Sequence, residues 1–300
     1  MRRSILIDCD PGLDDAAAIL TALGAADRLS LGAVTTVAGN VDLDAVTRNA
    51  AGLLALAGRT DVPLHAGCPR ALFGAGERAG HVHGADGIGG VALSPGPAPS
   101  PEHAVQAIRR LARGGGVTIV AIGPLTNLAL ALVEEPAIAT EIERLVIMGG
   151  VADGPGNVTD WAEFNFACDP EAARIVLESG LPTALFGLDV TRQAHVTPQR
   201  IAAFDALGTP AGKALARMLR AYQGERPRPV LHDPCTIAWL LQPDLFAGRR
   251  VRASVETANP AQRGRLMTTD DPQGPIELMT ALDADGFFAL LTQCVGGLRG

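Results

Sequence analysis

The chain has 300 residues, of which 47% are hydrophobic, and it carries a formal net charge of −7. We predict one domain over residues 1–300, because this apolar content suffices for a large α/β core and no Pro/Ser-rich or charged linker divides the chain. The absence of any basic run argues against a nucleic-acid surface, which needs clustered Lys and Arg. No uninterrupted apolar stretch of about 18 residues could cross a bilayer. The start "MRRSILIDCD" reaches acidic residues too soon for a secretory signal, so we expect a cytoplasmic protein without a membrane partner.

The cysteines predict neither a disulfide framework nor a zinc site. They are odd in number, widely spread and form no CxxC pair, which is typical of buried, reduced thiols. They are Cys9, Cys68, Cys168, Cys235 and Cys294.

Apolar β-rich runs alternate with amphipathic stretches along the chain. This βαβ rhythm predicts an α/β fold with a mostly parallel central sheet and helices on both faces, as in Rossmann-like proteins. The expected strands are 4–8, 29–37, 117–122, 145–148 and 183–188. The expected helices are 15–23, 43–57, 101–112, 127–133, 170–178 and 234–241. A small antiparallel extension follows near the C-terminus, with a hairpin formed by 249–258 and 264–270, then a strand at 277–282 and a helix at 285–295.

Polar residues collect at the carboxyl ends of these strands, where open α/β sheets bind their ligands. The first strand ends in four acids, and the later ones end in "VAGN", "GPLTN", "MGG" and "GLDVT". Asp189 in the last of these is ambiguous, since proximity to a site and a bond to its own turn both explain it. Asp169 in "DPEAA" is expected to cap a helix instead of binding a metal.

The four acids lie in "ILIDCDPGLDDAAAIL", at positions 8, 10, 14 and 15. Asp14 or Asp15 can cap the following helix, but capping does not account for all four carboxylates. An oxygen-only set without Cys or nearby His suits a hard cation such as calcium or magnesium; the alternative is a capped, solvated turn. Phosphoryl transfer from a "DxD" motif fits poorly, because the only lysine, Lys213, lies far from any strand end. No GxGxxG or P-loop pattern follows the strand.

Several motifs resemble those of the inosine-uridine nucleoside hydrolases, in the same order and spacing. They are "DCDPGLDDA", "TTVAGN", "AGHVHGADG", "GPLTNLA", "MGG", "NVTDWAEFNFACDPEAA" and "HDPC". The resemblance extends from about Ile5 to Leu241 and implies the nucleoside hydrolase fold.

The resemblance also implies a calcium ion held by Asp10, Asp15, the backbone carbonyl of Thr126, and Asp233. Asp10, which would contact both ion and water, resembles the general base, while Asp8 is expected to anchor the loop. His232 directly precedes Asp233 and is expected to protonate the leaving base; the alternative is a hydrogen-bonded scaffold residue.

Further family positions imply contacts to the ribose. Asp14 and Asn40 are expected to bind the 2- and 3-hydroxyls, and Met148 to pack against the sugar. The expected contacts to the 3- and 5-hydroxyls are Asn157, Glu163 and Asn165.

The base side is predicted less sharply. His81 and His83 alternate as on a strand, and His83 is the preferred neighbour of the base; incidental histidines in a surface loop are the alternative. Tyr222 is a candidate for stacking on the base or, alternatively, a packed helix residue. The short Pro- and Arg-rich segment "GERPRPVL" after it, and the 4% aromatic content, argue against purine preference by strong stacking. Trp161 either contributes to recognition or packs.

Together these features predict a calcium-dependent enzyme that hydrolyses the N-glycosidic bond of ribonucleosides to free base and ribose. Two alternatives are a pyrimidine-preferring hydrolase of uridine and cytidine, and a non-catalytic nucleoside- or ribose-binding protein. The resemblance further implies a homodimer or homotetramer.

Overall fold

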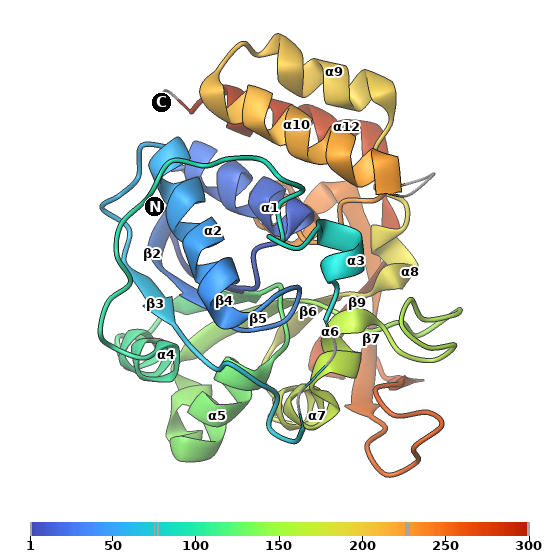
Figure 1. Cartoon of the computed structure of the whole chain (residues 1–300). Coiled ribbons are helices and arrows are strands. Elements are labelled where there is room, and N and C mark those ends of the chain that lie inside the picture. Colours follow the sequence, from blue (N-terminus) through green and yellow to red (C-terminus); the bar gives the residue numbers. More distant parts are fainter. Residues whose placement is uncertain (1, 75, 77, 226–228, 299–300) are drawn as a thin grey trace.

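The computed structural model describes residues 2–74, 76, 78–225 and 229–298 of the chain. Its strands form one nine-stranded sheet in the order β3-β2-β1-β4-β5-β6-β9-β7-β8 (Figure 1). Neighbouring strands from β3 to β9 pair in parallel, whereas β7 runs antiparallel to both β9 and β8. The strands are β1 (Arg3–Cys9), β2 (Leu29–Thr36), β3 (Leu64–Ala66), β4 (Val117–Ala121), β5 (Ile142–Met148), β6 (Thr183–Phe186), β7 (Phe246–Val255), β8 (Leu266–Asp270) and β9 (Ile276–Leu282). The predicted mostly parallel sheet with a C-terminal antiparallel extension is confirmed.

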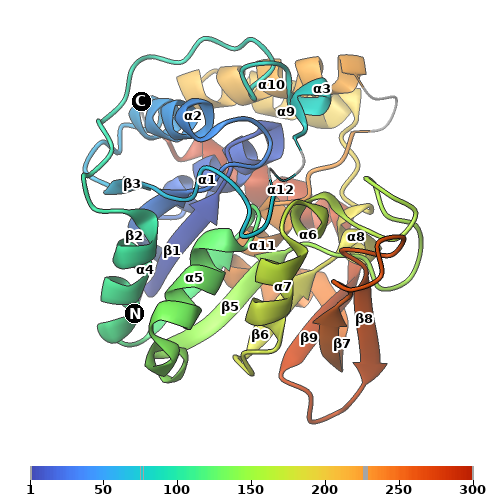
Figure 2. The same ribbon diagram turned by 60° about the horizontal axis from the view of Figure 1, so that its bottom comes forward.

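Helices cover both faces of this sheet (Figures 1 and 2). The helices α1, α2, α9, α10, α11 and α12 pack around one hydrophobic core, and α4, α5 and α7 around the other. The described helices are α1 (Leu13–Gly24), α2 (Leu43–Leu56), α3 (Gly80–His83), α4 (Ala104–Arg113), α5 (Thr126–Glu134), η1 (Pro136–Thr140), α6 (Phe164–Cys168), α7 (Pro170–Leu177), α8 (Leu188–Thr191), α9 (Pro198–Ala206), α10 (Pro210–Glu225), α11 (Pro234–Leu241), η2 (Pro243–Leu245) and α12 (Ala284–Gly296). In the described part of the chain, no helix has the length and apolar character that a membrane crossing needs.

Strand β1 shows why the central strands read as apolar runs. Ile5 and Ile7 belong to one core and Leu6 to the other, because successive side chains of a strand point to opposite faces. Asp8 interrupts this run. Its carboxylate accepts hydrogen bonds from Thr35 Oγ1 on β2 (2.6 Å) and Asn127 Nδ2 on α5 (2.8 Å), so it ties β1 to its neighbours.

The elements expected from the sequence are all present, with shifted ends. The helix expected from residue 101 begins at Ala104, because His103 caps it by accepting a hydrogen bond from the Val105 amide. The three-residue strand β3, the helices α9 and α10, and the short helices α3, α6, α8, η1 and η2 were not predicted. The cysteine prediction is confirmed, since all five are buried and free of disulfides.

Candidate active site

A cavity lies at the carboxyl ends of the parallel strands, bordered by residues that follow β1, β2, β4 and β5. Twelve predicted site residues line it: Asp10, Asp14, Asp15, Asn40, His83, Met148, Asn157, Glu163, Asn165, Tyr222, His232 and Asp233. The chain segments that supply them are far apart in sequence, and the parallel topology brings them to one edge of the sheet.

Two predicted residues stand apart from this set. Thr126 is buried at the start of α5, outside the lining of the cavity among described residues, and its hydroxyl donates to Asp169 Oδ2 (2.7 Å). The same Asp169 caps α7 by accepting a hydrogen bond from the Ala172 amide, which confirms its predicted role. The side chain of His81 lies outside the described ones, so its predicted base contact stays a prediction.

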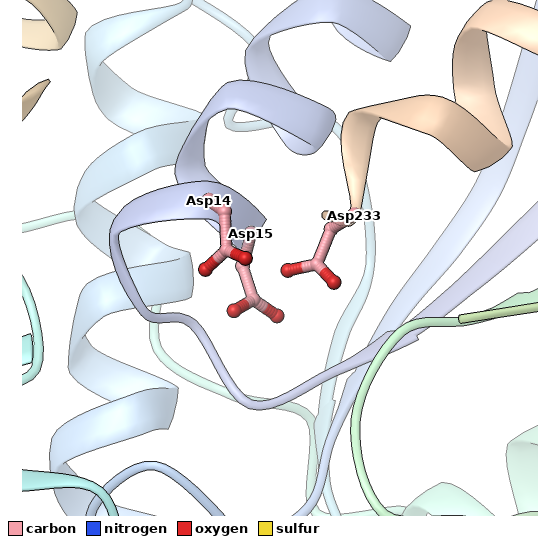
Figure 3. Close-up of side chains that lie close together, drawn as sticks. All are labelled: Asp14, Asp15 and Asp233. Carbon is pink, nitrogen blue, oxygen red and sulfur yellow. The ribbon is translucent and has the colours of Figure 1, made fainter. Parts of the chain in front are cut away.

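The floor of the cavity is a cluster of carboxylates. Oxygen atoms of Asp14, Asp15 and Asp233 lie within 4.8 Å of one another, although no metal ion is part of the structure. Figure 3 shows the three side chains converging from the first turn of α1 and from the start of α11. All three are buried, as is Asp10 beside them.

The turn between β1 and α1 holds Asp15 in place. Its carboxylate accepts hydrogen bonds from the backbone amides of Asp10 (3.1 Å) and Gly12 (2.9 Å). Gly12 occupies the N-cap position and has no side chain to cap with, so Asp15, three residues on, serves the first turn of α1. The capping expected for Asp14 or Asp15 is therefore performed by Asp15.

Asp10 lies between two glycines that sequence reasoning missed. A Cβ atom at Gly39 would overlap Asp10 Oδ2, and one at Gly123 would overlap Asp10 Oδ1. The Asn40 amide donates to Asp10 Oδ2 (2.7 Å), and the Asn40 side-chain amide donates to the Asp10 carbonyl (3.0 Å). The sequence does carry a signal for this arrangement, since a glycine follows each of the strands β2 and β4 that flank β1.

Burial and mutual repulsion shape the protonation of the cluster. Burial, reinforced by the charge of Asp14, raises the pKa of Asp15 to about 7. Burial also raises the pKa of Asp10 and Asp233 well above the usual range of a carboxyl group. In the absence of a cation, burial and mutual repulsion thus favour the protonated forms of Asp10, Asp15 and Asp233.

The donor set of this cluster fits a hard divalent cation. It offers carboxylate oxygens only, and neither sulfur nor imidazole nitrogen belongs to the group of close ligand atoms found in the described chain. A cation would replace the protons that the buried carboxylates otherwise require. This fit supports metal binding here. An all-oxygen donor set is common to sites for calcium and for magnesium.

Glu163 and Asn165 also line the cavity. Glu163 caps α6 by accepting from the Asn165 (2.9 Å) and Phe166 (3.2 Å) amides, and it also accepts from the Gly150 amide (2.9 Å). Burial raises the pKa of Glu163 to about 7, against these three hydrogen bonds, which lower it. Asn165 directs its side-chain amide at the carbonyls of Ile122 and Met148 (3.1 Å each), so its amide oxygen is the atom suited to a ligand hydroxyl.

Two aromatic rings close the cavity on the side of α3 and α10. His83 and Tyr222 stack with their ring centroids 5.9 Å apart, and His83 Nδ1 accepts a hydrogen bond from the Leu13 amide at the start of α1 (3.1 Å). Tyr222 is buried, in agreement with the packed-helix alternative, yet it also lines the cavity.

The strand-like alternation expected around His81 and His83 is wrong. Residues 80–83 form the short helix α3, in which the Val82 and His83 amides both donate to the carbonyl of Ala79. The helix ends at Gly84, whose φ of +83° favours glycine. Local turn bonds therefore override the alternating pattern.

Further residues of the base side have contrasting positions. His232 lines the cavity, and its Nδ1 lies 2.8 Å from Thr191 Oγ1. Trp161 is partly exposed outside the cavity lining and holds the guanidinium of Arg265 4.3 Å from its ring centroid, which agrees with a packing role. The segment "GERPRPVL" includes residues 226–228, which lie outside the described residues.

Sequence reasoning missed the apolar part of the lining. It consists of Ala79, Val82, Ile122, Val158 and Phe164. Apolar residues carry no chemical signature in a sequence, and the one signal is that Val82, Val158 and Phe164 adjoin predicted site residues.

Fold and cavity together define an α/β enzyme whose site is suited to a hard cation and a small hydroxylated ligand. The profile of a family described as "Inosine-uridine preferring nucleoside hydrolase" matches residues 5–289. The chain belongs to this family and is a nucleoside hydrolase.

Individual relatives extend this assignment over the whole chain. The "Pyrimidine-specific ribonucleoside hydrolase RihA" of Shewanella woodyi is 40% identical, covering 98% of this chain and 98% of that protein. The protein of the same name from Escherichia coli is 41% identical, covering 97% of each. A solved "Purine-Preferring Ribonucleoside Hydrolase from Gardnerella vaginalis" superposes with a TM-score of 0.92 at 32% identity, covering 99% of each chain. The plant nucleoside hydrolase PpNRh1 does so with a TM-score of 0.92 at 30% identity, covering 98% of this chain and 99% of that one.

Proposed function

We propose that this nucleoside hydrolase depends on calcium and cleaves the N-glycosidic bond of ribonucleosides to give free base and ribose. One observation carries the proposal: a buried carboxylate cluster and the side-chain amides of Asn40, Asn157 and Asn165 line the same cavity.

Calcium is the cation we assign to the cluster. The ligands would be Asp10, Asp15, the Thr126 carbonyl and Asp233, with Asp14 within reach of the same space. An all-oxygen set that includes a backbone carbonyl, on a rigid floor, suits calcium. When bound, the ion would lower the pKa of a coordinated water and orient the ribose diol.

Asp10 is the residue we assign as general base. Its carboxylate lies at the end of β1, fixed by the Asn40 amide and confined between Gly39 and Gly123. A carboxylate held this firmly can accept the proton of a water that attacks the anomeric carbon without first changing its rotamer.

The amides of Asn40 and Asn165 support the assignment of ribose contacts. Each side-chain NH₂ group already donates to protein oxygens, so each amide oxygen is left to accept a bond from a sugar hydroxyl. Asp14, Asn157 and Glu163 complete the hydroxyl contacts in this proposal, and Met148 packs against the ring.

His232 is the group we assign to the leaving base. Cleavage places negative charge on the base, and a positioned acid that protonates it contributes about 10²–10⁴ in rate. The support for this assignment is that His232 lines the cavity and directly precedes Asp233. His83, with His81 as the weaker candidate, and Tyr222 are proposed to border the base.

The charge of the cavity favours nucleosides over nucleotides. Five carboxylate residues line it, and in the part of the chain that is described no Lys or Arg does. A 5′-phosphate would meet repulsion without a compensating cation from the protein.

For the base we favour pyrimidines. The support is that relatives named pyrimidine-specific are 40–41% identical, whereas the purine-preferring structure is 32% identical. The rings of His83 and Tyr222 also stack on each other, which engages one aromatic face of each. A homodimer or homotetramer and a cytoplasmic location belong to the proposal on the strength of the family resemblance alone.

The deciding experiment is release of reducing sugar from uridine, cytidine, inosine, adenosine and guanosine, with calcium and after exhaustive chelation. We expect uridine and cytidine to be cleaved fastest, chelation to abolish release, and calcium to restore it. Uridine 5′-monophosphate is the matched control and should remain intact. Protein that is folded and calcium-loaded but releases no sugar from any nucleoside would contradict the hydrolase proposal and favour a nucleoside-binding protein.

A further inference from the structure

The short helix α8 and the two residues after it make hydrogen bonds to two parts of the chain that line the cavity. One is the loop that ends at Asn157, and the other is His232. We propose that this segment is a positioning element in which Thr191 orients His232 toward the leaving base, while Asp189 and Arg192 hold the loop that presents Asn157 to the ribose. The inference rests on the proposed function and adds residues that lie outside the cavity lining.

The first arm runs from Asp189 to the loop after β5. Asp189 accepts hydrogen bonds from the backbone amides of Ala152 (3.0 Å) and Asp153 (2.7 Å), one on each carboxylate oxygen. The Leu188 amide donates to the Gly150 carbonyl (2.9 Å), so backbone and side chain both fasten the start of this loop to α8.

The second arm runs from Arg192 to the same loop, closer to its functional residue. The Arg192 Nη2 atom donates to the carbonyls of Pro155 (2.8 Å) and Gly156 (3.1 Å), immediately before Asn157. The far side of the loop is fixed by the Asn157 amide, which donates to the Ala162 carbonyl (3.1 Å). The loop is thus held on both sides of Asn157 by bonds that leave its side chain to the cavity.

The third arm runs from Thr191 to His232. Thr191 is fully buried, and its hydroxyl lies 2.8 Å from His232 Nδ1. A hydroxyl can donate to the ring nitrogen or accept from it, so the contact holds the ring plane whichever state the imidazole adopts. Backbone bonds between residues 194–196 and 229–231 reinforce this arm, with the Leu231 amide donating to the Ala194 carbonyl (3.0 Å).

The segment is itself anchored to the sheet. Gln193 donates from its side-chain amide to the Thr280 carbonyl (2.8 Å) and accepts from the Leu282 amide (3.1 Å), and both partners belong to β9. A rigid base of this kind is what lets one hydrogen bond fix the orientation of a functional group.

The two sides of the element should be separable by choice of substrate. Uracil, the base released from uridine, is a poor leaving group that requires protonation, whereas p-nitrophenyl β-D-ribofuranoside releases a phenolate that needs none. Both substrates share the ribose. Substitution of Thr191 should therefore lower the activity with uridine alone, while substitution of Asp189 should weaken the activity with both substrates.

The experiment compares Thr191→Val, Thr191→Ser and Asp189→Asn on these two substrates in the calcium-loaded protein. We expect Thr191→Val to lower kcat for uridine by roughly 10–100-fold with little change for the nitrophenyl riboside. Thr191→Ser, which keeps the hydroxyl, should restore most of that activity. Asp189→Asn should raise KM for both substrates, roughly tenfold.

Thr183→Val is the matched control. Thr183 is also a buried threonine, and its hydroxyl donates one hydrogen bond, to the Leu181 carbonyl (2.9 Å). It lies at the amino end of β6, outside the cavity lining. Thr183→Val should leave kcat and KM for both substrates unchanged. This control separates the loss of His232 orientation from the general loss of a buried hydroxyl.

Two outcomes would overturn the inference, and they differ from failure of the proposed function. Equal loss on both substrates in Thr191→Val, or no loss on either, would refute the orienting role of Thr191. Unchanged KM in Asp189→Asn would refute the loop arm. A wild-type protein that cleaves the nitrophenyl riboside but no nucleoside would overturn the proposed function, and this inference with it.

Discussion

The floor and the base side of the cavity are built in opposite ways. The floor carboxylates follow one strand and begin two helices, and the backbone amides of Asp10 and Gly12, five and three residues before it, fix Asp15. The base side joins α3, α10 and His232, whose positions depend on contacts between distant segments, such as the stack of His83 on Tyr222. The comparison teaches that the acidic start of α1 is fixed by one local turn and is completed by Asp233 from α11, whereas the base side is assembled by tertiary packing alone.

This contrast has a functional meaning. Under the proposed function, a floor built around a short motif would vary little without loss of the cation and would fix the reaction. A base side supported by long-range contacts could change its lining while the floor stays intact, and it would set the preference among bases.

Asp10→Asn should have the largest effect, since it removes the proposed base from the floor. The substitution preserves shape between Gly39 and Gly123, and the loss of a general base should lower kcat by about 10²–10⁴-fold. Sugar release from uridine measures the loss, and calorimetric titration with uridine should show that binding persists. Activity within a few-fold of wild type would remove Asp10 from the mechanism.

Calcium binding should stabilise the fold through the floor alone. At a concentration 100 times its dissociation constant the ion should add about 2.7 kcal/mol to the free energy of unfolding. At one fixed calcium concentration the gain should be larger at pH 8 than at pH 5, because the raised pKa of Asp15, Asp10 and Asp233 means that protons compete with the ion at the lower pH and weaken its binding. Thermal unfolding of chelated and calcium-loaded protein at both pH values tests this. An equal shift at both would contradict it.

Glu163 should give the metal-free protein a measurable pH dependence of its own. Its pKa rises from 4.5 to about 7 on folding because it is buried. Between these values the folded state binds more protons than the unfolded state, so this group makes the free energy of unfolding fall as pH rises from about 4.5 to 7. Denaturant unfolding across this range should show a shallower fall in Glu163→Gln than in wild type. The same slope in both proteins would assign the dependence to other groups.

Tyr222→Phe should have the smallest effect and should touch only the base side. The ring that stacks on His83 remains and only the hydroxyl is lost, so the ratio of kcat/KM for uridine and inosine should change by less than about tenfold. The calcium-dependent thermal shift should be unchanged. A reduced calcium-dependent thermal shift would mean that the base side and the floor are energetically coupled. That result would contradict the contrast between them. Tyr222→Ala is unsuitable, because truncating a buried aromatic costs about 3–5 kcal/mol.

The two subsites also differ in how far the sequence predicts them. The strands and helices that carry Asp10, Asn40 and Met148 follow from apolar runs and capping residues, so the edge that bears the site could be predicted. The neighbours of Asp10 are glycines, whose role appears only when β2 and β4 flank β1.

The base side shows where prediction from sequence stops. His81 and His83 alternate in a pattern that resembles a strand, yet two backbone hydrogen bonds to the Ala79 carbonyl form a helix there. The contact of Thr191 with His232 joins segments that no periodicity relates. Such contacts depend on the packing of α8 between the sheet and the loop, which is a property of the assembled fold.

The convergence of Asp14, Asp15 and Asp233 bears on how the protein matures. The first two are synthesised near the beginning of the chain and the third only after α10, so a growing polypeptide cannot complete the cluster until most of the sheet can form. The cation would then bind the complete fold in preference to any truncated intermediate. Its binding would stabilise the native state only at the end of folding. A proteolytic cut anywhere between α1 and α11 would leave Asp14 and Asp15 on one fragment and Asp233 on the other. The cluster would then be lost when the fragments unfold or separate.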